Sequence, residues 1–231
     1  MRHGATVTRL ALRELWITFR LLAVLGSFTA AGALVALVPT TPGVALERLG
    51  IGFGLAIVVL AALSGWSLAE ERASGRAGWL VTRSVARGTY LFGWAAALAA
   101  AGLAGLAGGA LLGWLAASPP GIALDLPAFG AAVLAVAASV VLAVGIGLLC
   151  GALVLRGPAA LLAAGLSAVI GVVAVIADGP LGIGPAAGFL LLPRVPSGTV
   201  EGDALRMAGL GLLLAAALLG VVRAVLERAE L

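Results

Sequence analysis

Residues 90–117 read YLFGWAAALAAAGLAGLAGGALLGWLAA and contain no charged side chain. An apolar helix of roughly 20 residues crosses the hydrocarbon core of a bilayer, so this run is long enough to do so. Charged residues make up 10% of the whole chain, against about 25% in ordinary soluble domains. The chain is therefore predicted to be a polytopic membrane protein.

Five other apolar runs are also long enough to be spans. The six predicted spans are 21–38, 50–69, 90–117, 128–155, 159–177 and 206–222. Their apolar residues are continuous, which favours helices over a barrel, where apolar and polar residues alternate. We therefore expect an all-α integral membrane fold with six transmembrane helices in a single domain, residues 1–231.

The arginines are unevenly distributed between the gaps that separate these spans. With the N-terminus inside the cell, the inside segments hold Arg2, Arg9, Arg13, Arg20, Arg72, Arg76, Arg83, Arg87, Arg156, Arg223 and Arg228, and the outside segments hold Arg48, Arg194 and Arg206. Positively charged loops are retained in the cytoplasm, so both termini are predicted to be cytoplasmic. The same arginine bias accounts for the high pI, near 10.9. A nucleic-acid partner is therefore not needed to explain the positive charge.

The segment before the first span, residues 1–20, is predicted to be an amphipathic helix at the cytoplasmic membrane surface. On a helical wheel Leu12, Leu15 and Phe19 fall on one side, and the arginines of the segment cluster elsewhere. The alternative is a cytosolic extension of the first span.

The polar residues of the predicted spans offer few groups for catalysis or ion binding. They are hydroxyl side chains, namely Ser27, Thr29, Ser64, Ser67, Ser139 and Ser167, with no ionisable group well inside. We expect these hydroxyls to bond to their own helix backbone. Cys150 is the single cysteine and lies in the fourth span, where a packed apolar role is expected.

Nucleotide hydrolysis by this chain is not expected. All fourteen basic residues are arginine, whereas a phosphate-binding P-loop requires a lysine. His3 is the only histidine, so a multi-histidine metal site within the chain is excluded. We therefore expect no enzymatic activity, metal or cofactor here, and any ATPase would be a separate polypeptide. An intramembrane enzyme is the weakest class, because no nucleophile has a base beside it.

Three glycines in the third predicted span recur at every fourth position: Gly105, Gly109 and Gly113. Such small-residue ridges let helix backbones approach closely in lipid. The ridge is predicted to pack within one bundle, and self-association with a second copy is the alternative.

The largest predicted cytosolic segment, residues 70–88, reads EERASGRAGWLVTRSVARG. A helix would place four of its residues on one stripe: Arg72, Arg76, Trp79 and Arg83. The residues alone leave two uses open, which are anchoring of lipid headgroups and docking of a protein partner.

This segment resembles the cytosolic loop of ABC-2 type transporter permeases, with a type V exporter-like transmembrane domain. The residues that carry the resemblance are Glu71, Arg72, Gly75, Leu80, Val81, Val85, Arg87, Leu91 and Gly93. Ser84 and Trp94 stand where the family pattern has proline and lysine. The resemblance implies a permease subunit of an ATP-driven exporter, with ATP and Mg²⁺ bound by a separate cytosolic ATPase subunit and with a second permease copy.

The resemblance also implies roles for particular residues. The coupling loop, 70–87, would dock the ATPase through Glu70, Glu71, Arg72, Gly75, Arg76, Trp79, Leu80, Arg83 and Arg87. The external segment 178–205 would be re-entrant, with Gly184, Pro185, Gly188, Phe189 and Pro193. The substrate would be amphipathic or hydrophobic, and the all-arginine, alanine- and glycine-rich composition indicates a prokaryotic inner membrane.

Other functions are compatible with the same residues. A non-transporting scaffold or assembly subunit would use the same loop to hold a cytosolic partner. Haem-exporter-like and copper-enzyme-maturation permeases have a similar layout and are alternative subfamilies.

Overall fold

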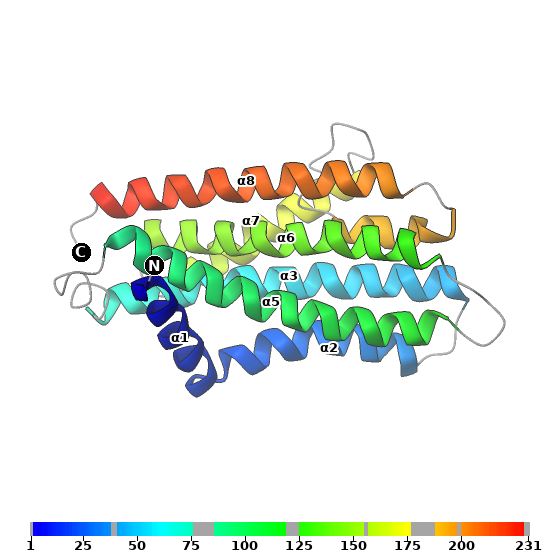
Figure 1. Ribbon diagram of the computed structural model, residues 1–231, viewed down its shortest axis with the longest axis horizontal. Coiled ribbons are helices and arrows are strands. Elements are labelled where there is room, and N and C mark those ends of the chain that lie inside the picture. Colours follow the sequence, from blue (N-terminus) through cyan, green and yellow to red (C-terminus); the bar gives the residue numbers. More distant parts are fainter. Residues whose placement is uncertain are drawn as a thin grey trace.

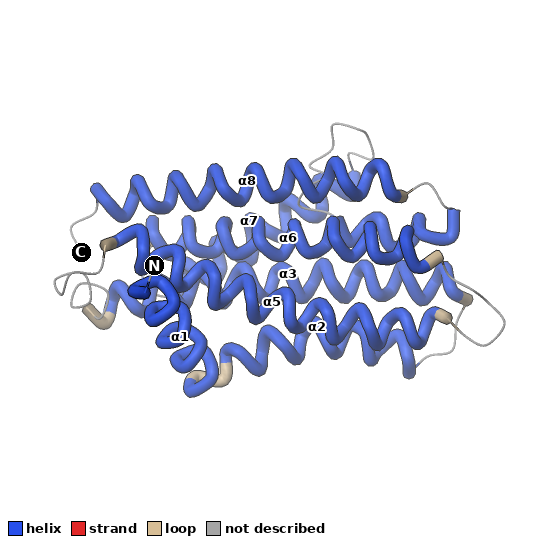
Figure 2. Tube along the Cα trace, viewed as in Figure 1, coloured by secondary structure: helices blue, strands red, loops and turns tan. Residues whose placement is uncertain are grey.

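The structure of this protein, a computed structural model, describes residues 2–37, 41–75, 86–118, 125–154, 157–176, 188–197 and 200–228. Every regular element in these ranges is helical (Figure 2). The elements are α1 (Arg2–Ile17), α2 (Arg20–Leu37), α3 (Pro42–Ala73), α5 (Arg87–Ala117), α6 (Leu126–Leu153), α7 (Gly157–Ile176), the 3-10 helix η2 (Gly188–Ser197) and α8 (Glu201–Arg228). The predicted all-α character is confirmed.

The long helices lie side by side in one bundle, and the N- and C-termini lie at the same end of it (Figure 1). We call this the terminal end and the other the far end. The last turns of α3, α6 and α8 and the first turn of α5 are at the terminal end. Helices α3 and α6 are central, because each packs against the other and against α5, α7 and η2.

Four helices, α3, α5, α6 and α8, are long and apolar enough to cross a membrane. Helices α1 and α2 are bent by 77° and count as a fifth candidate only when taken together as one broken span. Helix α7 is apolar over Gly157–Val173, which is shorter than the roughly 20 residues of a full crossing. The described residues therefore support a multi-pass membrane protein with four to five candidate spans, and the count of six stays a prediction.

A sharp turn at Phe19 separates α1 from α2. Phe19 has a left-handed φ of 59°, and its N–H donates to the Trp16 carbonyl oxygen at 3.1 Å, which ends α1. Helix α1 packs on α5 and buries Val7, Ala11 and Leu15. The predicted helix was thus too long, because α1 ends at Ile17 and Phe19 lies in the turn that follows, where the helical wheel does not apply. The bend also argues against a straight extension of the first span.

Two helices extend beyond the predicted apolar runs by about a turn or more at both ends. Helix α3 begins at Pro42 rather than at Gly50, and α8 covers Glu201–Arg228 rather than 206–222. Glutamate and arginine interrupt an apolar run but are good helix formers, so hydropathy underestimates helix length. The predicted external segment 178–205 accordingly ends inside the first turns of α8.

Glycines bring the central helices into close contact. A Cβ atom on Gly147 of α6 would lie 2.5 Å from the Cβ of Ser64, and one on Gly151 would lie 2.5 Å from the Gly65 carbonyl oxygen. Non-bonded heavy atoms prefer separations of about 3.5 Å or more. Only glycine therefore permits this α3–α6 crossing.

The predicted glycine ridge is buried within the chain. Gly105 and Gly109 face Phe28 of α2, and Gly113 faces Leu49 of α3. These three glycines therefore serve packing between helices of one bundle.

Candidate coupling site at the terminal end

The predicted coupling loop is described only at its two flanks, because residues 76–85 lie outside the described residues. The predictions for Arg76, Trp79, Leu80 and Arg83 fall there and stay predictions. The flanks hold the other predicted docking residues, which are Glu70, Glu71, Arg72, Gly75 and Arg87. Residues 70–73 are the end of α3, and Arg87 is the first residue of α5.

Arg72, in the last turn of α3, binds the end of α6. Its Nη1 atom donates hydrogen bonds to the carbonyl oxygens of Gly151 at 3.0 Å and Ala152 at 2.5 Å. The last carbonyls of a helix have no partner inside the helix and carry its partial negative charge, so a guanidinium stabilises them. The Arg72 side chain is therefore engaged with α6.

Arg87 makes the matching contact on α8. Its Nη1 atom donates to the carbonyl oxygens of Leu226 at 2.9 Å and Glu227 at 3.0 Å, in the last turn of that helix. The two arginines thus bind the ends of two different helices from either side of residues 76–85.

The two acidic residues of the segment connect α3 to other helices. Glu71 is buried, and the Tyr90 hydroxyl of α5 donates to its Oε2 atom at 3.2 Å. Glu70 forms an ion pair with Arg20 of α2 at 2.6 Å. Both flanks of the loop are therefore fixed to the bundle by polar contacts.

Arg20 was missed as part of this site by sequence reasoning. Its Nη1 atom donates to the Ser67 hydroxyl oxygen at 3.2 Å, and its guanidinium lies 4.7 Å from the centre of the Trp66 ring. Such cation–π contacts contribute about 0.5 to 2 kcal/mol. Arg20 precedes Glu70 by 50 residues, so no local pattern connects them.

Gly75 lets the chain leave α3. It has a left-handed φ of 73°, and its N–H donates to the Arg72 carbonyl oxygen at 3.2 Å. This conformation is readily adopted by glycine and costs other residues free energy. The predicted glycine therefore has a backbone role at the end of α3.

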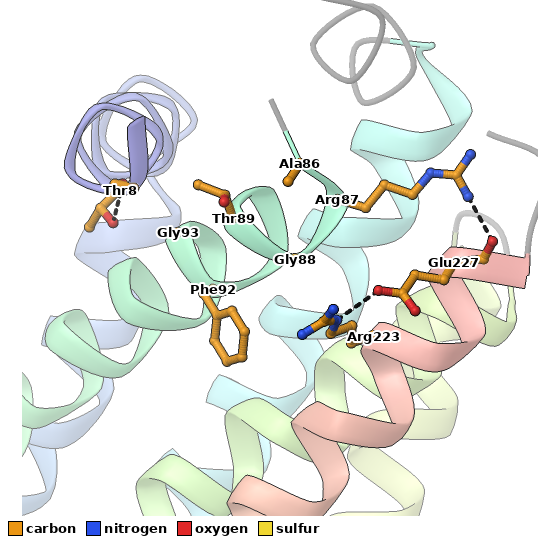
Figure 3. A pocket seen from close by; sticks show the side chains of 10 residues that line it. Thr8, Ala86, Arg87, Gly88, Thr89, Phe92, Gly93, Arg223 and Glu227 are labelled. Atoms are coloured by element: carbon orange, nitrogen blue, oxygen red, sulfur yellow. Dashed lines mark hydrogen bonds and ion pairs between the residues drawn. The ribbon is translucent and has the colours of Figure 1, made fainter. Parts of the chain in front are cut away.

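A groove of about 800 Å³ opens beside this site, between α1, α5 and α8 (Figure 3). Gly88 and Phe92 line it from α5, and Arg223 and Glu227 line it from α8. The Arg223 Nε atom pairs with the Glu227 carboxylate at 2.7 Å. The spacing of Arg223 and Glu227 is enough to predict this pair. Its position beside α5 is set by the packing of the helices.

At the far end, η2 packs against both central helices, α3 and α6. A Cβ atom on Gly188 would overlap the Ala135 backbone, and the Gly188 N–H donates to the Ser139 hydroxyl oxygen at 3.1 Å. The Phe189 ring covers Gly54 of α3. Of the predicted re-entrant residues, Gly188, Phe189 and Pro193 belong to η2, and Gly184 and Pro185 lie outside the described residues.

The predicted self-bonding of hydroxyls is confirmed for Ser27, Thr29, Ser64 and Ser139, each of which donates to a carbonyl of its own helix. Ser67 instead accepts a hydrogen bond from Arg20. The Ser167 hydroxyl oxygen is buried without a hydrogen-bond partner in the described part of the chain.

Ser139→Ala is expected to loosen η2. The substitution leaves the buried Gly188 N–H without its acceptor, which costs about 1 to 3 kcal/mol. Hydrogen–deuterium exchange of a peptide covering η2 should become faster. Ser27→Ala is the matched control, because that hydroxyl bonds only within α2 among the described residues. Equal exchange in the two variants would contradict a role for Ser139 in holding η2.

Compared with known proteins, the chain matches no protein-family model and no curated protein sequence. Within the described residues, no group of three His, Cys, Asp or Glu side chains could hold a metal ion.

Proposed function

We propose that this protein is the membrane-spanning permease subunit of an ATP-driven ABC-2 type exporter and works with a separate cytosolic ATPase. Helices α2 and α7 would complete six spans, and both termini would lie in the cytoplasm of a prokaryotic cell. A second copy would complete the permease. The substrate would be amphipathic or hydrophobic, because the helices offer apolar side chains and few hydroxyls.

The observation that supports coupling is the attachment of both loop flanks to other helices. Arg72 binds the end of α6, Arg87 binds the end of α8, and Glu70 pairs with Arg20 of α2. A partner that displaced residues 76–85 would therefore move three further helices at once. Anchoring to lipid headgroups alone would not require such contacts.

The proposed mechanism follows from these contacts. Closure of the ATPase would pull on residues 76–85, and the two arginines would carry the displacement to α6 and α8. Because α6 also packs against η2, the movement would reach the far end of the bundle. Separation of η2 from α3 and α6 would then open the far end for release of the substrate.

The test is purification of the tagged protein from its native membranes in mild detergent, followed by mass spectrometry of the proteins that co-purify. We expect a stoichiometric P-loop ATPase that is lost in the double variant Arg76→Glu, Arg83→Glu. The control is Arg48→Glu, Arg206→Glu, which reverses two exposed charges on helix segments at the far end and should keep the ATPase. Retention of the ATPase by the first variant would contradict docking at the loop.

A non-transporting scaffold is the second candidate. The same polar contacts hold the loop flanks to the bundle, which also suits a static platform for a cytosolic protein. This function predicts a co-purifying partner without a P-loop and no conformational response to nucleotide. Recovery of such a partner, with no ATPase in several detergents, would favour the scaffold. Within the exporter class, haem-exporter-like and copper-enzyme-maturation subfamilies stay alternatives.

A further inference from the structure

The groove between α1, α5 and α8 combines cationic and apolar surfaces. Arg87 and Arg223 contribute two positive charges and Glu227 one negative charge. Phe92 is 50% exposed and lies farther from the terminal end than Arg87, about 1.4 turns along α5 (Figure 3). The lining thus combines the charged groups of Arg87, Arg223 and Glu227 with the exposed aromatic ring of Phe92, and so offers contacts to both parts of an amphiphile.

Arg223 has donors available for a ligand. Its Nε atom is used by Glu227, and its side chain is 56% exposed. Within the described residues its two terminal nitrogens have no hydrogen-bond partner. A guanidinium presents five N–H donors in a planar fork that matches a phosphate group, so Arg223 can bind Glu227 and a phosphate together.

Gly88 keeps the space beside this guanidinium open. A Cβ atom at this position would lie 3.6 Å from the Arg223 Nε atom, in ordinary contact. Any longer side chain would therefore extend into the groove. The volume of about 800 Å³ is within the range of small-molecule sites and would admit a headgroup with the start of a chain.

We propose that this groove binds an anionic phospholipid, with its phosphate at Arg223 and an acyl chain along Phe92. The terminal end carries most of the arginines, and anionic lipids are attracted to such surfaces. The bound lipid would connect α1 to α8 and would leave the coupling contacts of Arg87 in place. The proposal depends on membrane insertion of the chain and is independent of the exporter function.

The experiment is native mass spectrometry of the intact protein in detergent, titrated with phosphatidylglycerol or with phosphatidylcholine of the same chain length. We expect preferential binding of phosphatidylglycerol. Arg223→Gln should weaken it roughly tenfold, the effect of losing one charge-assisted hydrogen bond. Glu227→Gln should strengthen it, because a competing carboxylate is removed. Arg206→Gln, on the same helix at the far end, should leave the affinity unchanged.

Four outcomes would overturn the proposal, three of which concern the affinities of the ligands and of the arginine variants. The first is equal binding of the two lipids by the unmodified protein. The second is equal affinity of the Arg223→Gln and Arg206→Gln variants for phosphatidylglycerol. Both variants must then unfold at the same temperature without lipid, which shows that both are folded. The third is binding of glycerol 3-phosphate as tight as that of phosphatidylglycerol, which would identify a site for a soluble anion. Gly88→Leu should block the lipid by filling the groove, and unchanged binding would place the lipid elsewhere.

Discussion

Gly147→Leu is expected to lower the free energy of unfolding by about 3 kcal/mol, the upper end of the usual cost of overpacking. A Cβ atom at this position would overlap the Ala61 carbonyl oxygen and lie 2.5 Å from the Ser64 Cβ. Neither atom can rotate away, because one belongs to the α3 backbone and the other is bonded to it. The two central helices would have to separate. Unfolding in mixed micelles with increasing SDS, followed by circular dichroism, measures the change.

Gly130→Leu is the matched control for this substitution. Gly130 lies on the same helix, and its Cβ would have no atom within 4 Å. Replacing an exposed helical glycine removes a helix-propensity cost of up to about 1 kcal/mol, so this variant should be as stable as the unmodified protein or more so. If both variants unfolded at the same SDS fraction, the α3–α6 contact would not be the one that limits stability.

Arg72→Met is expected to lower the free energy of unfolding by about 2 to 3 kcal/mol. Methionine fills most of the space but donates no hydrogen bond, so the carbonyl oxygens of Gly151 and Ala152 lose a charged partner. The loss is moderated because the Arg72 Nε atom is buried without a partner in the described part of the chain. Unfolding in SDS mixed micelles again gives the measurement.

Two further variants separate the contact from the loss of charge. Arg48→Met removes an exposed arginine at the other end of α3 and should change stability by less than about 0.5 kcal/mol, as surface substitutions usually do. Arg72→Lys keeps the charge and one ammonium donor group, so it should recover part of the stability. Equal stability of the Arg72→Met and Arg48→Met variants would show that Arg72 does not hold α6 to α3.

If Arg72 transmits force to α6, the same variant has a functional consequence. Arg72→Met is expected to keep the proposed ATPase attached through residues 76–85 but to weaken the connection to the other helices. Co-purification of the proposed ATPase should then be unchanged, and coupled transport should fall. Loss of a docking residue would instead reduce both.

Much of the fold could be predicted from apolar runs. Each of the six predicted apolar runs overlaps a helix of the structure, because an uninterrupted apolar run must satisfy its own backbone in a bilayer, although only four to five candidate spans are supported. The lengths of α3 and α8 were underestimated, since their ends are polar but still helical. The surface helix predicted over residues 1–20 implied a change of direction before the first span, but the left-handed turn at Phe19 was not predicted, because no glycine indicates it.

The candidate site was predictable only in part. Clustered charges predicted the loop, whereas Gly75 was predicted as a docking residue and its role at the end of α3 was found only in the structure. The spacing of Arg72 predicted that it shares a helix stripe with Arg76 and Arg83 for binding a lipid or a protein partner, whereas its guanidinium binds α6. The partners of Arg20 and Arg87 lie on helices far away in the chain, and no periodicity could connect them.

The sequence by itself determined that this protein is helical, apolar and arginine-rich between its apolar runs. These properties depend on each segment alone, because burial in lipid and backbone hydrogen bonding act within one helix. Only the tertiary structure decided which helix ends receive Arg72 and Arg87, and which helices meet at Gly147 and Gly109. Such contacts depend on the distance between segments that are remote in the chain. A hydrogen bond of about 3 Å forms or fails with a shift of one ångström, and only the packed bundle sets that distance.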